Sequence, residues 1–233
     1  MWGLVAAAVL PVLFYLFFVY KKDSMKEPVK ILLKCFVGGM FSIILSLLIS
    51  VPVSTLSAYF VTPEAKAFFT AFMQAAIPEE TAKLAVLFWL VWKSKDFDQH
   101  YDGIVYAVFV SLGFAMVENI MYVVEGGLGV AVIRAVLSVP GHGFFGVFMG
   151  YHIALARFHS GSQRTRQLLL AFLVPVILHG IFDYLLFYSG YVSENSMLVL
   201  TVFIAFFVFI IWLWRAGWKR IQKLVKNDMQ ITG

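Results

Sequence analysis

AAIPEETAKLAV, residues 75–86, places two adjacent carboxylates and a lysine within an apolar stretch that continues directly into LFWLVW, residues 87–92. A charged side chain at the centre of a bilayer costs at least about 2.5–3.5 kcal/mol on insertion scales. Glu79, Glu80 and Lys83 are therefore unfavourable in a membrane helix unless they serve a purpose. Their presence indicates a functional site at membrane depth.

The composition of the chain is that of an integral membrane protein. Of its 233 residues, 61% are hydrophobic and 13% are charged, whereas a soluble domain carries about 25% charged residues. The sequence predicts an all-α, polytopic bundle of transmembrane helices that forms one domain over residues 1–233, with the lipid bilayer as its surroundings. The net charge of +5 is typical of cytoplasmic loops, and no motif for binding nucleic acid is present.

The N-terminal segment MWGLVAAAVLPVLFYLFFVY, residues 1–20, is followed, not preceded, by basic residues at Lys21 and Lys22. A cleaved signal peptide has the opposite order, so we expect a first transmembrane helix with its N-terminus outside the cell. Cys35 is the only cysteine, so no disulfide can form within the chain.

Apolar segments divide the chain into seven candidate spans, each judged against the about 20 residues that a spanning helix needs. Lysines and arginines cluster after the first, third, fifth and seventh segments, whereas the other loops hold only Lys66 and Arg134. Because basic residues favour cytoplasmic loops, we predict seven spans with the N-terminus outside and the C-terminus in the cytoplasm. The segments cover residues 3–20, 30–53, 66–92, 103–124, 130–157, 168–189 and 195–214.

Residues 215–233 follow the last segment and are predicted to form a cytoplasmic tail. Trp218, Ile221, Leu224 and Val225 recur there at helical spacing, with basic residues between them. This pattern is typical of a basic amphipathic helix that lies on an anionic leaflet. A frayed basic anchor is the alternative.

Polar and ionisable side chains lie inside four of the apolar segments. Counting about 1.5 Å per helical residue places the ionisable ones between the midplane and the outer leaflet, so we expect one shared polar cavity that opens towards the outside. Pairs four residues apart, such as Glu79 with Lys83 and His179 with Asp183, share a helix face. The residues at depth are Glu79, Glu80, Lys83, Glu118, Asn119, His142, His179 and Asp183, with Phe114 four residues before Glu118.

Prolines accompany these groups. Pro78, Pro140 and Pro175 each lie within about one helical turn of a buried polar residue. Proline frees a backbone carbonyl and bends a helix, and broken helices at membrane depth are tolerated where they line a cavity. Pro78 could equally begin an internal helix whose N-terminus points at the two glutamates.

Amide hydrolysis fits this set of groups. It needs a base that activates water, donors for the oxyanion and an acid for the leaving amine. A glutamate in an apolar cavity suits the base, and the two histidines suit oxyanion donors or metal ligands. Zinc is a candidate cofactor, although no HExxH motif is present, and no GxSxG motif indicates a serine nucleophile. The candidate zinc ligands are Glu79, Glu80, Glu118, His142 and His179.

Simpler explanations exist for each residue alone. An intramembrane Glu–Lys pair can hold helices together, and a single buried histidine is often a packing residue, which is what we expect of His152. These explanations do not account for four helices that place paired carboxylates, two histidines and adjacent prolines at one depth. The conjunction favours a functional site.

Four sequence features follow one another on successive predicted helices. EETAK (79–83) has the form EExxK, FAMVE (114–118) the form FxxxE, His142 stands alone in the next helix, and HGIFD (179–183) has the form HxxxD. In this order they resemble the motifs of the PrsW family of bacterial intramembrane proteases, which are related to the CAAX-prenyl endopeptidase superfamily. The motif core spans about residues 75–185, and Asp23, Glu27 and Pro28 match a DxxxxEP stretch. The CAAX enzymes carry a histidine where Glu118 stands, which favours the PrsW branch.

The resemblance implies a bacterial, multi-pass plasma-membrane protease of the site-1 type, which clips a membrane-anchored anti-sigma factor on its outer side. Its substrate would be a single-span membrane protein. The resemblance implies Glu79 as the base, Glu80 as its partner or a second ligand, and Lys83 as the residue that holds Glu79. Glu118, His142, His179 and Asp183 would complete the site, with Phe114 and Asn119 in support. We favour a water activated by glutamate over a metal-bound water.

Two other classes of protein use similar groups. A transporter would use buried carboxylates for ion or proton coupling and would contain the same broken helices. A non-catalytic protein could present or protect a membrane peptide. The absence of an internal inverted repeat counts against the transporter, and the filled motif positions count against a degenerate protease.

Overall fold

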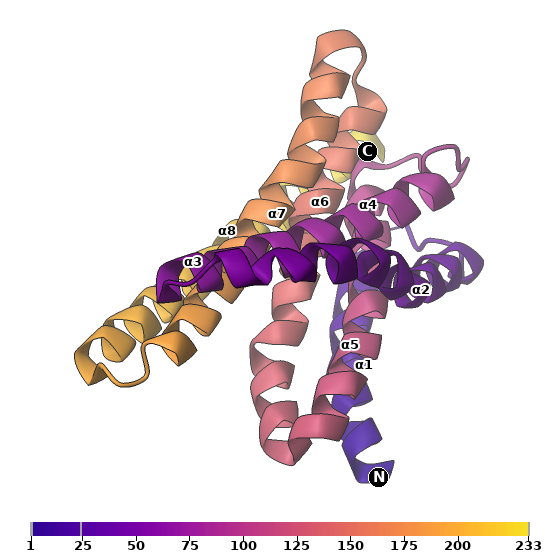
Figure 1. The fold of residues 1–233 in the computed structure, drawn as a ribbon. Helices are drawn as coiled ribbons and strands as arrows, with labels where there is room; N and C mark the ends of the chain where they lie inside the picture. The colour runs from indigo at the N-terminus through magenta and orange to yellow at the C-terminus, as the bar shows by residue number, and fades with distance from the viewer. Residues whose placement is uncertain (1, 24, 233) are drawn as a thin grey trace.

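The computed structural model describes residues 2–23 and 25–232, and within them every regular element is a helix (Figure 1). The predicted all-α class is therefore confirmed. The elements are α1 (Trp2–Lys22), α2 (Val29–Ser54), η1 (Thr55–Tyr59), α3 (Pro63–Phe68), η2 (Phe69–Ala76), α4 (Ile77–Val91), α5 (His100–Val136), α6 (Ser138–Phe158), α7 (Gly161–Tyr191) and α8 (Ser196–Thr232).

Five helical stretches of the described chain are long and apolar enough to cross a membrane: Trp2–Lys22, Val29–Tyr59, His100–Phe158, Gly161–Tyr191 and Ser196–Asp228. The third is 59 residues long and folds back at Gly127, whose φ of 73° and ψ of −163° break the helix. This break lies between the predicted segments 103–124 and 130–157. The predicted segment 66–92 is not among the five, because it carries four charges, at Lys66, Glu79, Glu80 and Lys83. The count of seven spans and their orientation stay predictions.

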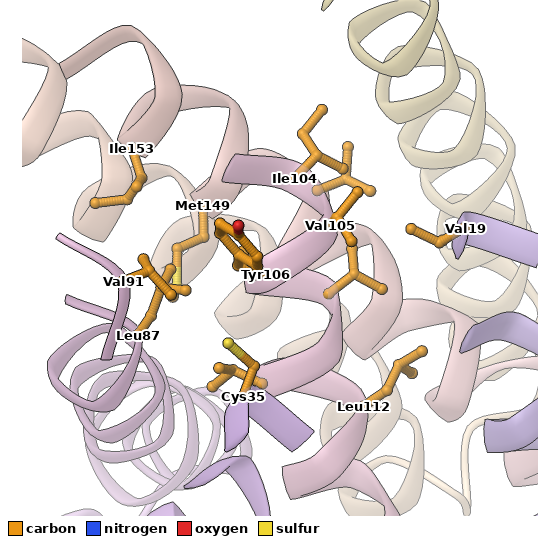
Figure 2. Packing of buried hydrophobic residues seen from close by; sticks show 14 of the residues in the cluster. Val19, Cys35, Leu87, Val91, Ile104, Val105, Tyr106, Leu112, Met149 and Ile153 are labelled. Carbon is orange, nitrogen blue, oxygen red and sulfur yellow. The ribbon is translucent and has the colours of Figure 1, made fainter. Parts of the chain in front are cut away.

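Helix α5 lies at the centre of the bundle and packs against α1, α2, α4, α6 and α8. Glycines permit its closest crossing: a Cβ at Gly39 of α2 would collide with the carbonyl of Val110, and one at Gly113 of α5 with the carbonyl of Phe36. Figure 2 shows side chains from α1, α2, α4, α5 and α6 meeting in one core around this helix. Its members include Val19, Cys35, Leu87, Val91, Ile104, Tyr106, Met149 and Ile153.

The helix that leads into the glutamates is widened. Residues of η2 form a π-helical segment, in which the N–H of Ile77 donates to the carbonyl of Phe72. Pro78 is the second residue of α4, which directly follows the π-helical residues. The backbone stays helical through Ala76 (φ −57°, ψ −48°) and Ile77 (φ −63°, ψ −52°), so the widened turn precedes a proline inside one continuous helix, and whether the helix end before the glutamates acts as a dipole stays a prediction. π-Helical turns occur frequently at functional sites.

The C-terminal segment is helical and amphipathic, as predicted, and it packs against the bundle, while its cytoplasmic location stays a prediction. Helix α8 runs unbroken from Ser196 to Thr232, and Ile221 and Leu224 are buried in the main core. The Asp228 carboxylate accepts hydrogen bonds from the backbone N–H groups of His100 (3.1 Å) and Tyr101 (2.8 Å) at the start of α5. The expectation that the apolar face lies on the leaflet is therefore wrong, because the bundle already covers that face; residue 233 lies outside the described residues.

Candidate active site

Lys83 of α4 stands at the centre of the buried polar cluster. Its Nζ lies 3.1 Å from Glu79 Oε2, 2.8 Å from Glu80 Oε1 and 3.1 Å from His142 Nδ1. The ring of Phe114 lies below it, with its centroid 4.2 Å from Nζ, which adds a cation–π contact. The lysine side chain is fully buried, so its charge is stabilised only by these partners. It holds Glu80 and His142 as well as Glu79.

The contacts of His142, on α6, determine which ring nitrogen carries its proton. The ammonium of Lys83 has donors only, so Nδ1 accepts from it at 3.1 Å. Nε2 then carries the proton and donates to Glu118 Oε2 at 2.8 Å. Both nitrogens of this imidazole are therefore paired within the protein.

His179, on α7, lies between carboxylates on both sides. Its Nδ1 is 2.9 Å from Glu80 Oε1, and its Nε2 is 3.2 Å from Asp183 Oδ2 and 4.0 Å from Glu79 Oε2. Each nitrogen can donate only when it is protonated, so with Glu80 and Asp183 both ionised the two hydrogen bonds together require the imidazolium. Phe145 stacks on the ring at a centroid distance of 4.7 Å. The predicted i,i+4 pair with Asp183 is present, and Glu80 supplies a second carboxylate.

The two adjacent glutamates have different surroundings. Glu80 is fully buried, accepts from Lys83 and His179 through Oε1, and lies behind the cavity. Glu79 lines the cavity, with 13% of its side chain exposed. Its Oε2 accepts from Lys83, while Oε1 has no hydrogen bond to the residues that the structure describes. Glu79 thus presents a free carboxylate oxygen to the cavity, as a base for a water molecule must.

A cavity of about 130 Å³ lies next to these groups, between α4, α5, α6 and α7. One wall is polar and the other is apolar, with Phe182, Leu186 and Phe187 from α7. Since a liquid water occupies about 30 Å³, the cavity has room for a peptide group and a water molecule. Its polar wall consists of Glu79, Glu118, Tyr122, Arg134, Ser138, His142, His179 and Asp183.

Sequence reasoning missed Arg134, which it treated only as an isolated basic residue in an outer loop. Arg134 Nη2 donates to Glu118 Oε2 and Nε donates to Asn119 Oδ1, both at 2.8 Å. Asn119 in turn donates to the carbonyl of Ala8 in α1 at 2.7 Å. The turn at Gly127 brings Arg134 back beside Glu118, and a helical hairpin assumed about that glycine would have revealed the pair. Tyr122 and Ser138 of the polar wall were missed as well.

The DxxxxEP stretch lies outside this site. The Asp23 carboxylate accepts from the backbone N–H groups of Met25 (3.1 Å) and Glu27 (3.2 Å) and so folds the loop between α1 and α2. The Glu27 carboxylate meets the hydroxyl of Tyr106 in α5. Tyr106 precedes Glu118 by 12 residues on the same helix, which corresponds to about 18 Å. Asp23 and Glu27 therefore position the loop between α1 and α2 against α5.

The remaining histidines also lie apart from the cluster. His152, expected to be a packing residue, pairs through Nδ1 with Gln167 Oε1 at 2.7 Å. His100 pairs with Asp228, and His159 contacts the carbonyl of Leu155 at the end of α6. None of the three lines the cavity described above.

The donor set is one that zinc accepts. Glu79, Glu80, His142 and His179 each offer one ligand atom, and these atoms lie within 4.8 Å of one another. Oxygen and imidazole nitrogen are common zinc ligands, and Glu80 Oε2 is buried without a hydrogen-bond partner among the described residues. The residues therefore fit a metal by type. The Lys83 ammonium contacts three of the four residues and leaves Glu79 Oε1 and Glu80 Oε2 without a hydrogen bond to the described residues.

Comparison with known proteins agrees with this geometry. A family model described as PrsW family intramembrane metalloprotease matches residues 27–213. The chain is 36% identical to Protease PrsW of Oceanobacillus iheyensis, over 98% of this chain and 99% of the relative. It is 32% identical to Protease PrsW of Bacillus subtilis, over 99% of this chain and 100% of the relative. It is 30% identical to Protease PrsW of Clostridioides difficile, over 96% of this chain and 92% of the relative. No solved structure matches it. The chain therefore belongs to the PrsW family of intramembrane proteases, and it is a multi-pass membrane peptidase.

Proposed function

We propose that this protease cleaves a single-span membrane protein near the outer leaflet, with Glu79 as the base that activates water. The observation that carries the proposal is Oε1 of Glu79, which makes no hydrogen bond to the described residues and belongs to a side chain that lines the cavity beside Lys83 and His179. An anti-sigma factor is the substrate that the family resemblance supports. The transporter and non-catalytic alternatives lose support, because the chain belongs to a protease family.

The chemistry follows from the positions of the groups. Glu79 Oε1 accepts a proton from water as the water oxygen attacks the scissile carbonyl carbon, and the electrons of the C=O π bond move to the carbonyl oxygen. The protonated Glu79 then gives that proton to the leaving amide nitrogen as the C–N bond breaks. Lys83 and His179 lie beside Glu79 Oε2 and keep the carboxylate oriented throughout.

Glu80 and Asp183 keep this arrangement rigid. Glu80 receives hydrogen bonds from both Lys83 and His179, so one carboxylate fixes two of the groups that face Glu79. Asp183 holds the other nitrogen of His179. A reacting constellation held in this way needs little reorganisation when charge develops.

A metal, where bound, would be held by Glu79, Glu80, His142 and His179 and would supply Lewis-acid polarisation of a carbonyl or water. The Oε1 of Glu79, which has no hydrogen bond to the described residues, supports the glutamate-activated water.

The size of the cavity bears on the form of the substrate. A helix with its side chains is about 10–12 Å across, and a cavity of about 130 Å³ cannot admit it. We infer that the substrate enters as an extended segment, so that cleavage takes place where its membrane helix ends or unwinds.

Proteolysis by reconstituted protein tests the proposal. The wild type is compared with Glu79→Gln on a panel of single-span reporter proteins, with and without a chelator. Glu125→Gln serves as the matched control, because Glu125 is exposed in the same membrane protein and lies outside the cavity. We expect Glu79→Gln to lose activity by about 10²–10⁴-fold, the usual contribution of general-base catalysis.

The control and the chelator separate the outcomes. Glu125→Gln should cut at the wild-type rate, and the chelator should leave cleavage unchanged. Cleavage by Glu79→Gln at the wild-type rate would show that the assigned base is wrong. Cleavage that disappears with chelator and returns with zinc would replace the activated water with a metal-bound one.

A further inference from the structure

Neither catalytic-site histidine has an N–H group left for a substrate. The single N–H of His142 donates to Glu118, and the two N–H groups of His179 face Glu80 and Asp183. Stabilisation of an oxyanion requires donors aimed at the position where the charge develops. The sequence-based expectation that these histidines supply the donors therefore does not match the hydrogen bonds that they make.

Arg134 does have unused donors at the cavity. Its guanidinium carries five N–H groups, of which Nε uses one on Asn119 and Nη2 uses one on Glu118. Nη1 makes no hydrogen bond to the described residues, and the arginine lines the cavity together with Glu79. The side chain is 12% exposed, and its guanidinium lies 4.3 Å from the ring centroid of Tyr122.

The guanidinium is held in place before any substrate arrives. Two hydrogen bonds of 2.8 Å and the ring of Tyr122 fix its plane. Asn119, which receives one of those bonds, is itself fully buried and tied to the carbonyl of Ala8 in α1. A donor restrained on this many sides loses little freedom when it binds, which is the property that an oxyanion site needs.

We propose that Arg134 stabilises the oxyanion of the scissile peptide through the N–H groups of Nη1, an inference that rests on the proposed function. When the water oxygen attacks the carbonyl carbon and passes its proton to Glu79, the C=O π electrons move to the carbonyl oxygen. That oxygen then receives the Nη1 hydrogen bonds until the C–N bond breaks and the C=O bond re-forms. Asn119 is a positioning residue, because it acts through Arg134.

The charges around the cavity favour a carbonyl over an acidic side chain as the group bound. The charge of Arg134 is already compensated by Glu118, whose Oε2 lies 2.8 Å from Arg134 Nη2. Two more carboxyl groups, those of Glu79 and Asp183, line the same cavity. A carboxylate entering the cavity would be repelled by these groups. A carbonyl arrives neutral and gains its negative charge only in the transition state, so the arginine binds the transition state more tightly than the substrate.

Steady-state cleavage of a reporter by reconstituted Arg134→Gln and Arg134→Lys tests this proposal. We expect Arg134→Gln to lower kcat by about 10²–10³-fold, as removal of one oxyanion donor does elsewhere, with KM close to that of the wild type. Arg134→Lys keeps the positive charge but not the planar pair of Nη donors, so its kcat should lie between that of the wild type and that of Arg134→Gln. Guanidinium ion added to Arg134→Ala should restore part of kcat.

The matched control is Arg157→Gln. Arg157 lies on the next helix, α6, and its guanidinium donates to the carbonyls of Trp92 and Ser94, away from the cavity. This variant should keep the wild-type kcat once it is shown to be folded. Binding of the uncleaved reporter is measured in a Glu79→Gln background, where addition of Arg134→Gln should leave the affinity unchanged.

Three outcomes overturn the proposal. Arg134→Gln with a wild-type kcat would remove the arginine from the reaction, while the difference between wild type and Glu79→Gln would still support the protease chemistry. Equal losses in Arg134→Gln, Glu118→Gln and their double variant, with equal falls in melting temperature, would reduce Arg134 to a partner of Glu118. A wild type that cuts no better than Glu79→Gln would overturn the proposed function and this inference together.

Discussion

The buried ammonium of Lys83 shows how one residue can make the whole cluster tolerable. Two adjacent carboxylates at membrane depth repel each other, and both are expensive to remove from water. Lys83 lies 3.1 Å from one and 2.8 Å from the other. The pairing offsets the cost of burial only while every member is present, because removal of one partner leaves an uncompensated charge.

Lys83→Met should therefore lower the free energy of unfolding by about 3–5 kcal/mol, the usual effect of breaking a buried ion pair, and should abolish proteolysis. Lys66→Met is the matched control, since Lys66 is exposed on α3. Unfolding in detergent micelles, followed by circular dichroism, gives the two free energies. Equal stability of the two variants would mean that the glutamates are accommodated without the lysine.

At the residue scale, linear spacing predicted most of the cluster, because i,i+4 pairs are a property of any helix. Glu79 with Lys83 and His179 with Asp183 could be paired from the sequence alone. Arg134 could not, because its partner Glu118 lies 16 residues away across a turn. Which oxygen of Glu79 is free likewise depends on how four helices pack, and spacing does not encode that packing.

At the scale of elements, the α5 hairpin depends on one backbone conformation. Gly127 has φ 73° and ψ −163°, a region that is essentially restricted to glycine. The turn places Glu118 opposite Arg134 and His142. The sequence predicted a break between residues 124 and 130, but not that one glycine forms it.

Gly127→Ala should lower the free energy of unfolding by about 1–3 kcal/mol, the cost of holding a side chain in this region. Gly129→Ala is a close control, because Gly129 lies two residues away in ordinary helical geometry with open space around its Cα. It should be neutral or stabilising by up to about 1 kcal/mol. Denaturant titration of the two variants decides, and a neutral Gly127→Ala would show that the turn adapts.

The widened helix before Glu79 could not be predicted from residues 66–92, whose apolar run has no visible break before Pro78. Two conditions select it: Pro78 cannot donate a backbone hydrogen bond, and Phe72 packs where a Cβ on Gly180 would stand. The second condition joins η2 to α7 and exists only in the assembled bundle.

At the scale of the whole molecule, the end opposite the active site contains a second set of buried acids. Burial raises the pKa of Asp23 and that of Glu27 above their ordinary values. The folded state therefore holds more protons than the unfolded state, so that the free energy of unfolding falls as the pH rises from the ordinary carboxyl pKa through the raised one. Below that window these acids impose no penalty.

Glu27→Gln should flatten this part of the pH dependence, because the glutamine cannot ionise and can still accept the hydrogen bond of Tyr106. The measurement is the difference in melting temperature between wild type and variant at a series of pH values, with exposed Glu194→Gln as the control. The variant should gain stability relative to the wild type as the pH rises. A difference that stays constant with pH would show that Glu27 is already ionised in the folded protein.

The hydrogen bonds of Asp228 to the first turn of α5 also constrain the order of assembly. His100 and Asp228 are 128 residues apart, so ribosomal synthesis makes the central helix long before it makes the carboxylate that completes its start. During translation the N–H groups of His100 and Tyr101 lack this partner, and the helix that carries Glu118 acquires its full set of contacts only when α8 docks. A chain that ended before Asp228 would thus contain every residue of the candidate active site but would lack the hydrogen bonds that hold the start of α5.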